Sequence, residues 1–318
     1  MSFEQSRMVL GFHNENFRGP GIVAKNLISG LNRLNYPWIN AATGVTNNQE
    51  IFEKPDVYTV FGVLQALALP QNIKIDLLGP NTFVMPREAQ GLIAQSKALV
   101  VPSQWCKDKY LFYDKDIIGN RPIYVWPVGV DTEFFKQNAE KTKPQKISDM
   151  KVLVYYKNRP EEVLQEAITL LSNFGIKLEN IIILRYGSFS RNDLIAACNT
   201  SHFAVLVAHT ESQGLANLEI LSMGLPMLVF DQKEWIYLDD KSIVWNEATS
   251  VPYFDETCGK KVANFIGENY GEFFDKVLDG SYKPREYVVN NFGLEQRAEE
   301  YLRIIIESNK LHIFSWLV

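Results

Sequence analysis

Short apolar runs and amphipathic stretches alternate along most of the chain. The first half has a long amphipathic stretch at residues 22–34, in which Val23, Leu27 and Leu31 share one face at helical spacing. The strands that we predict for this half are residues 8–12, 57–61, 73–78, 98–101 and 123–126, and the further helices are 87–96 and 104–112. Such alternation is typical of a parallel sheet covered by helices.

A second series of the same kind follows a polar interruption. Residues 136–149 are rich in lysine and almost free of apolar residues, which is typical of a linker. The predicted strands beyond it are residues 152–156, 181–186, 203–207 and 227–230, and the predicted helices are 161–174, 192–198 and 215–223. Because 318 residues with 46% hydrophobic content suffice for two cores, we predict an α/β protein with domains at residues 1–140 and 150–295.

Overall composition narrows the classes of function. A net charge of −5 gives no general attraction to nucleic acid. The three cysteines, Cys106, Cys198 and Cys258, are widely spaced, so we expect neither disulfides nor a zinc site. We therefore expect the protein to be located in the reducing cytoplasm. The first apolar run is too short for a signal peptide. The apolar tail at residues 311–318 leaves open peripheral contact with the inner face of a membrane, although packing back on the protein is the preferred interpretation.

Residues 211–231 carry the strongest chemical signal, because a glycine turn and a helix stand between two apolar strands. The helix begins after Gly214, so its unpaired N–H groups and positive dipole end are expected at the carboxyl end of the preceding strand, where a pyrophosphate is favoured. Glu211 lies at the strand exit and Glu219 about one turn inside the helix. A carboxylate set back from a phosphate can accept hydrogen bonds from ribose or sugar hydroxyls.

The block Glu211-Ser-Gln-Gly-Leu-Ala-Asn-Leu-Glu219, followed by Met223-Gly-Leu-Pro226, resembles the Glu-x7-Glu signature of retaining glycosyltransferases. These have two Rossmann-like domains facing each other across a cleft (the GT-B fold), and the chain is most similar to family 4. The resemblance implies that Glu211 lies beside the donor sugar and that Glu219 holds the ribose. The further donor contacts that it implies are Ser212, Gln213, Gly214, Leu215, Ala216 and Asn217. The family turn reads Gly-Phe-Gly, so a different sugar preference is expected here.

Two other parts of the second half fit the family pattern. The family takes positive charge for the phosphates from an arginine and a lysine after the first strand of this domain. This chain has Lys157 and Arg159 there, and Glu161 and Glu162 replace the lysine expected further along. The resemblance implies that both cations stabilise the leaving group, and that Arg185 and Tyr186, after the next strand, border the nucleotide base.

The first half resembles the acceptor domain of the family. Gly19-Pro-Gly21 is similar to the glycine-rich loop that faces the cleft, with Gly21 toward the donor and Gly19 on the acceptor side. His13 and Asn81 are further acceptor-side candidates; Asn81 stands where many members have a histidine. The resemblance also implies that a C-terminal helix and tail, residues 296–318, cross back to the first domain.

The function implied is transfer of a sugar from a uridine or guanosine diphosphate sugar to an acceptor hydroxyl, on a glycan, a lipid-linked molecule or another acceptor. The enzyme is expected to be a metal-independent hexosyltransferase that retains the anomeric configuration and uses no cofactor besides its donor substrate. In the usual proposal for this family, the departing phosphate accepts the proton of the acceptor hydroxyl while amides and cations stabilise the leaving group.

Three alternatives remain open. Asp114 and Asp116 have the spacing of the manganese-binding pair of metal-dependent glycosyltransferases, although they follow a helix, so a charged surface turn is the preferred interpretation. The altered phosphate loop is compatible with a nucleotide-sugar-binding protein that no longer transfers sugar. A sugar-nucleotide epimerase is the third. We expect structural roles for His202 and His209, because no third metal ligand accompanies them.

Overall fold

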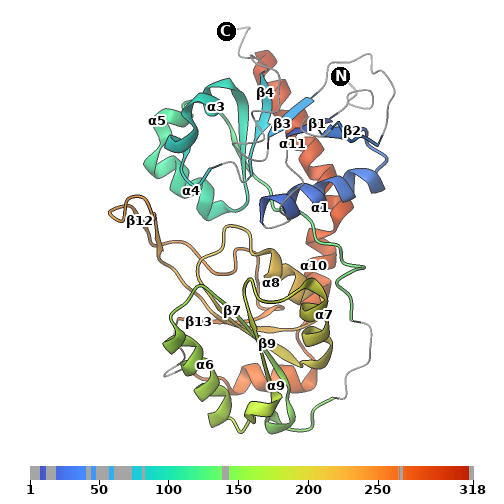
Figure 1. The fold of residues 1–318 in the computed structure, drawn as a ribbon, viewed down its shortest axis with the longest axis vertical. Helices are drawn as coiled ribbons and strands as arrows, with labels where there is room; N and C mark the ends of the chain where they lie inside the picture. Colours follow the sequence, from blue (N-terminus) through green and yellow to red (C-terminus); the bar gives the residue numbers. More distant parts are fainter. Residues whose placement is uncertain are drawn as a thin grey trace. The chain divides into compact units, whose positions relative to one another are not determined.

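The computed structural model describes residues 8–11, 19–40, 44–47, 57–60, 74–80, 83–137, 143–263, 265 and 268–314. They form two compact units, each built on one parallel sheet (Figure 1). Unit 1 is Met1–Gly129 with Phe292–Val318, and unit 2 is Val130–Asn291. The chain therefore passes between the units twice, first before the lysine-rich segment that the sequence marks as a linker.

Unit 1 contains a six-stranded sheet with the order β2-β1-β3-β4-β5-β6. Its strands are β1 (Met8–Gly11), β2 (Trp38–Asn40), β3 (Val57–Val60), β4 (Ile75–Leu78), β5 (Ser96–Val101) and β6 (Ile123–Val125), and all pairs are parallel. Its helices are α1 (Pro20–Arg33), η2 (Pro86–Ala89), α3 (Gln90–Gln95), α4 (Gln104–Tyr113), α5 (Lys115–Ile118) and α11 (Leu294–Phe314). The helix predicted at residues 87–96 was too long, because Ser96 already pairs with Ile75 as the first residue of β5.

Helix α11 returns to unit 1 and packs along α1, as the red and blue helices in Figure 1 show. The apolar face of α1 is buried, with Val23 and Leu27 at 3% and 1% exposure. Gly30 lies against the Leu294 backbone, where any side chain would collide with it. The Trp126 indole N–H donates to the Arg297 carbonyl at 2.8 Å. The start of the C-terminal helix is thus built into the core of unit 1.

Unit 2 contains a five-stranded parallel sheet with the order β13-β10-β9-β7-β8. Its strands are β7 (Val152–Lys157), β8 (Ile181–Arg185), β9 (Phe203–Ala208), β10 (Met227–Phe230) and β13 (Gly259–Val262), with a separate hairpin of β11 (Trp235–Ile236) and β12 (Val244–Trp245). Its helices are η3 (Ile147–Asp149), α6 (Glu161–Asn173), η4 (Leu178–Asn180), α7 (Arg191–Thr200), α8 (Leu215–Ser222), α9 (Gly271–Asp279) and α10 (Pro284–Phe292).

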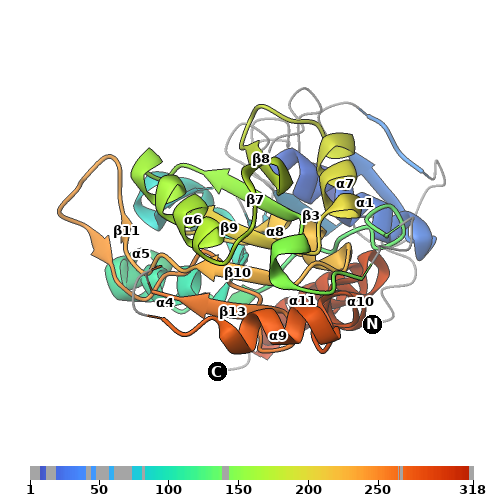
Figure 2. The ribbon, with the colours of Figure 1, turned by 90° about the horizontal axis from the view of Figure 1, so that it is seen from below.

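The core of unit 2 lies between this sheet and two helices. Every residue of β9 is buried, as expected for a central strand covered on both faces. Alternate residues of β7, β9 and β10 pack with α6 and α9, where Phe203 meets Phe273 and Phe274 in edge contacts. The connection from β7 to β8, which contains α6, runs one way along the sheet, and the connections that contain α7 and α8 run the other way. Because parallel crossovers are right-handed, α7 and α8 cover the face opposite to α6 (Figure 2).

The strand order of unit 2 reverses at its first strand. From β7 the chain steps to β8 on one side, and then returns across β7 to β9, β10 and β13 on the other. In open parallel sheets the crevice at such a reversal, outside the carboxyl ends of the strands, is the usual ligand-binding position. We therefore expect the ligand-binding residues to follow β7 and β9.

Candidate functional site

The carboxyl ends of β7 and β9 are neighbours in the sheet, with Lys157 in register with Ala208. This brings two predicted catalytic residues together, because Lys157 ends β7 and Glu211 follows β9. The Lys157 ammonium lies 2.6 Å from Glu211 Oε1, and the two side chains are only 20% and 16% exposed. The ammonium also lies 4.4 Å from the ring centroid of Tyr186, which is itself half-exposed. Burial raises the pKa of Glu211, and the Lys157 charge opposes this rise.

Gly214 begins α8 in the left-handed conformation, with φ 71° and ψ 52°. A Cβ atom at this position would stand 2.7 Å from Asn217 Nδ2, so both the backbone and the close approach require glycine. The N-cap residue is glycine, which has no side chain to cap the helix, and among the described residues no side-chain cap is found; Leu215 and Ala216 are partly exposed. The first N–H groups of α8 are therefore oriented for an acceptor supplied from outside the helix.

Glu219 lies inside α8 and is nearly buried, with its side chain 8% exposed. Its Oε1 accepts a hydrogen bond of 2.9 Å from Nη2 of Arg191, the first residue of α7. Burial raises the pKa of Glu219 to about 7, against the lowering influence of Arg191. Glu211 and Glu219 both raise the pKa of the buried Tyr155 phenol, in addition to the larger effect of its own burial, so the two carboxylates share one electrostatic neighbourhood.

The other predicted cations of unit 2 have protein partners. Arg159 packs over the Phe230 ring at 4.8 Å and hydrogen-bonds Gln232 through Nη1, while its buried Nε has no acceptor among the described residues. Arg185 is exposed and binds both carboxylate oxygens of Glu161, at 2.9 and 2.7 Å. The acidic residue that replaces the expected family lysine thus holds Arg185.

The loop at residues 249–251 joins the strand ends and α8, and sequence reasoning did not identify it. Asp231 Oδ1 accepts from the Thr249 hydroxyl at 2.6 Å and the Ser250 N–H at 2.8 Å. The Thr249 carbonyl accepts the Glu211 N–H, and the Ser250 carbonyl accepts Nδ2 of Asn217 at 2.8 Å. Asn217, predicted as a donor contact, therefore uses its amide to fix this loop. Of the remaining predicted contacts, Ser212 is exposed and Gln213 is buried.

The acceptor-side candidates belong to unit 1. Gly19 caps α1 with φ 47°, and Gly21 lies in the first turn of that helix. His13 and Asn81 lie outside the described residues. Asp114, one of the proposed manganese ligands, is 3% exposed and pairs with Arg87 at 2.6 Å, and Asp116 is in the first turn of α5.

The histidines His202 and His209 and the three cysteines have ordinary structural surroundings. His202 Nδ1 accepts the Lys151 N–H at 2.8 Å, and His209 Nδ1 lies 3.1 Å from the Thr210 hydroxyl. The cysteines are all buried free thiols. In the described part of the chain there is no cluster of three histidine, cysteine or acidic residues suited to a metal ion. Nor does any described helix have the length and apolar character to cross a bilayer.

Comparison with solved structures identifies the architecture. A glycosyltransferase from Rickettsia africae aligns with a TM-score of 0.58 and 15% identity over 96% of this chain and 99% of that one. A sucrose-phosphate synthase from Thermosynechococcus elongatus aligns with a TM-score of 0.57 and 10% identity over 95% and 98%. AviGT4, a glycosyltransferase of avilamycin A biosynthesis, gives 0.51 and 13% over 94% and 97%.

Neither a protein-family model nor a curated protein matches the sequence. These three structural neighbours are GT-B glycosyltransferases, and the likeness to them extends over nearly the whole of each chain. The chain thus has the α/β architecture of the GT-B fold, with two Rossmann-like domains.

Proposed function

We propose that the protein is a glycosyltransferase that moves a sugar from a nucleoside diphosphate sugar to an acceptor hydroxyl. The donor binds at the carboxyl edge of the unit 2 sheet, with its diphosphate on the start of α8 and its ribose at Glu219. The transfer retains the anomeric configuration and needs no metal ion.

One observation carries this proposal: a helix start at Gly214 that no side chain of the described residues caps and a nearly buried carboxylate, Glu219, occur together on α8 at the strand-order reversal. The helix start favours an anion through its free N–H groups and its dipole. Burying a carboxylate is costly unless something binds it, and vicinal ribose hydroxyls are suitable donors. A nucleoside diphosphate has both groups on one molecule.

The chemical step requires charge stabilisation on the leaving group. The bond from the anomeric carbon to the phosphate oxygen breaks, the acceptor oxygen bonds to that carbon, and the acceptor proton passes to the departing diphosphate. The α8 amides, Lys157 and Arg159 stabilise the charge that develops there. Glu211, held beside Lys157, positions the sugar and stabilises positive character at its ring carbon.

The first test is a thermal-shift screen of uridine and guanosine diphosphate sugars and of the free diphosphates. A ligand at one hundred times its Kd adds about 2.7 kcal/mol to the free energy of unfolding, which is easily resolved. We expect Glu219→Ala to weaken donor binding and Glu211→Ala to lower turnover more than binding. The control is Glu272→Ala, which removes an exposed carboxylate from α9.

Turnover is then followed by release of the nucleoside diphosphate, with and without a chelator, and by proton NMR of the anomeric signal of the product. Transfer that survives chelation and keeps the donor configuration supports the proposal. Stabilisation by no diphosphate, or unaltered kinetics in both glutamate variants, refutes it. Binding without transfer would identify a nucleotide-sugar-binding protein instead.

A further inference from the structure

Arg191 is a cation near this edge that the sequence did not suggest and that the proposed chemistry does not use. Its guanidinium binds Oε1 of Glu219, 28 residues away in the chain. No donor from the described residues reaches the other oxygen, Oε2. The pair therefore leaves half of a nearly buried carboxylate available to a ligand.

We propose that Arg191 is a positioning residue of the donor site, which supplies the counter-charge to Glu219 and aims its carboxylate at the ribose hydroxyls of the nucleotide. This inference rests on the proposed function and concerns the same site. Arg191 acts through Glu219 and needs no contact with the donor itself.

Arg191 is held both at its backbone and at its guanidinium. It is the first residue of α7, whose start is held by a capping box in which Ser190 accepts the Asp193 N–H and Asp193 accepts the Ser190 N–H. Its guanidinium lies 5.4 Å from the ring centroid of Phe135, which is 2% exposed. A side chain held at its backbone and beside an aromatic ring loses little further entropy when it orients a carboxylate.

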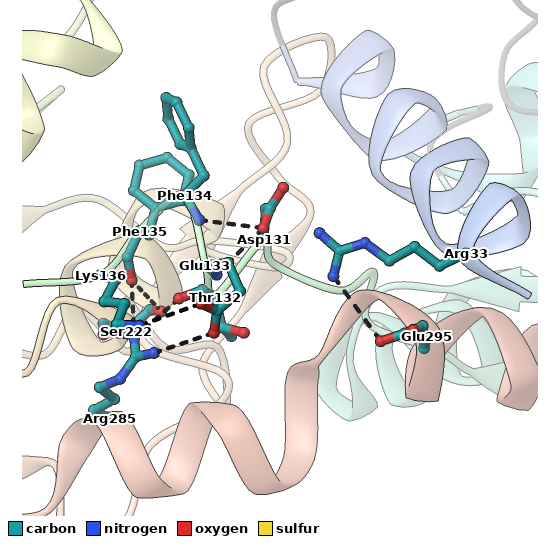
Figure 3. A network of polar contacts seen from close by, with 10 residues as sticks. All are labelled: Arg33, Asp131, Thr132, Glu133, Phe134, Phe135, Lys136, Ser222, Arg285 and Glu295. Atoms are coloured by element: carbon teal, nitrogen blue, oxygen red, sulfur yellow. Dashed lines mark hydrogen bonds and ion pairs between the residues drawn. The ribbon is translucent and has the colours of Figure 1, made fainter.

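Phe135 is anchored in turn to the helix that carries Glu219. Its carbonyl accepts the hydroxyl of Ser222 on α8 at 2.8 Å and Nη1 of Arg285 at 3.1 Å, in the network shown in Figure 3. The positions of Arg191 and Glu219 are therefore fixed relative to each other: α8 carries the carboxylate, and Phe135, which is hydrogen-bonded to α8, supports the cation. A group placed only to balance surface charge would not require such support.

The charges around Glu219 explain why this cation matters. Among the described residues, Arg191 of α7 is the charged group that lowers the pKa of Glu219, and Tyr155 of β7 is a titratable neighbour whose own pKa Glu219 raises. Tyr155 is neutral over the ordinary range because burial raises its pKa further, so Arg191 provides the counter-charge. Even with this counter-charge the pKa of Glu219 is about 7, and without it the carboxyl would hold its proton to higher pH. A neutral carboxyl accepts weaker hydrogen bonds than an ionised one.

The test is calorimetric titration with uridine diphosphate and guanosine diphosphate between pH 6 and pH 9. For the wild type, affinity should fall as the pH drops below about 7, where Glu219 takes up a proton. For Arg191→Gln we expect the pH midpoint to rise by one unit or more, binding at pH 7 to weaken by about fivefold or more, and affinity to recover toward pH 9. Arg191→Lys, which keeps the charge, should leave the midpoint nearer the wild-type value. Lys276→Gln, an exposed loss of charge on α9, is the matched control and should behave as wild type.

A second variant keeps the inference testable if an unpaired buried Glu219 prevents folding. The double variant Arg191→Gln with Glu219→Gln leaves no unpaired charge at these two positions, and it should bind no more weakly than Glu219→Gln alone. Weaker binding by the double variant, or a uniform loss in Arg191→Gln with an unmoved midpoint, would overturn the positioning role while leaving the proposed function intact. A wild type that binds neither diphosphate removes both.

Discussion

Replacing Gly214 by alanine should destabilise unit 2 by an amount that the structure divides into two parts. The left-handed backbone costs an L-residue about 1–2 kcal/mol. The new methyl group would stand 2.7 Å from Asn217 Nδ2, whose hydrogen bond to the Ser250 carbonyl must then lengthen or break. Losing a hydrogen bond of this kind costs a further ~1 kcal/mol. The expected total is about 2–3 kcal/mol.

Thermal unfolding followed by circular dichroism measures this loss, since about 1 kcal/mol shifts the melting temperature by roughly 2–4 °C in a domain of this size. The matched control is Gly280→Ala at the end of α9, where φ is 79° and no atom lies within 4 Å of the added methyl group. It has the backbone cost alone, so Gly214→Ala should melt several degrees lower than Gly280→Ala. Equal melting temperatures would refute the reasoning, because they would show that the Asn217 contact contributes nothing.

Two further perturbations test the surroundings of the site. Arg285 donates through Nη1 to the carbonyls of Thr132, Phe135 and Ser222 (Figure 3), so Arg285→Met should cost about 2–3 kcal/mol in urea unfolding, and Arg285→Lys less; equal effects of the two variants would contradict this role. The folded-state pKa of Glu219 is about 7, above the ordinary 4.5, so the folded protein holds this proton more tightly than the unfolded chain does. The resulting stabilisation is complete below pH 4.5 and is lost as the pH rises through 7. We therefore expect Glu219→Gln to flatten the decline in melting temperature over this range without ligand, and an unchanged slope would contradict the shifted pKa.

The parts of the fold that the sequence predicted are those with strong local patterns. The strand at residues 227–230 was predicted with its observed bounds, and the helix after Gly214 ends one residue earlier than expected. Each is bounded by a glycine or by a clear change from apolar to polar residues. The hairpin β11–β12 and the strand β2 were missed because they span only two or three residues each, and β13 was missed because two of its four residues are lysines, Lys260 and Lys261. Pairing with a neighbouring strand, rather than intrinsic preference, determines such segments.

The passage of the chain between units also follows tertiary contacts that local composition does not show. The linker was predicted at the lysine-rich segment, residues 136–149. In the structure, unit 1 ends at Gly129 and unit 2 begins at Val130, before this segment. A Cβ atom at Gly129 would collide with the Gly293 and Leu294 backbone, and the Gly129 carbonyl accepts Nδ2 of Asn26 at 2.8 Å. These partners come from α1 and from the C-terminal segment, and neither is near Gly129 in sequence.

The site shows the same division between local signal and long-range pairing. Glu211, Gly214 and Glu219 lie within one strand, turn and helix, so their order along the chain already places them at one sheet edge. Lys157 could be suggested only by resemblance, and its contact with Glu211 depends on β7 being adjacent to β9. Strand alternation alone does not determine that order, since a chain that continued in one direction from β8 would separate the two residues. The reversal of strand order therefore brings Lys157 and Glu211, which are far apart in the sequence, into one ion pair. The contact of Arg191 with α8 depends on the same reversal, because Arg191 lies on the crossover between β8 and β9.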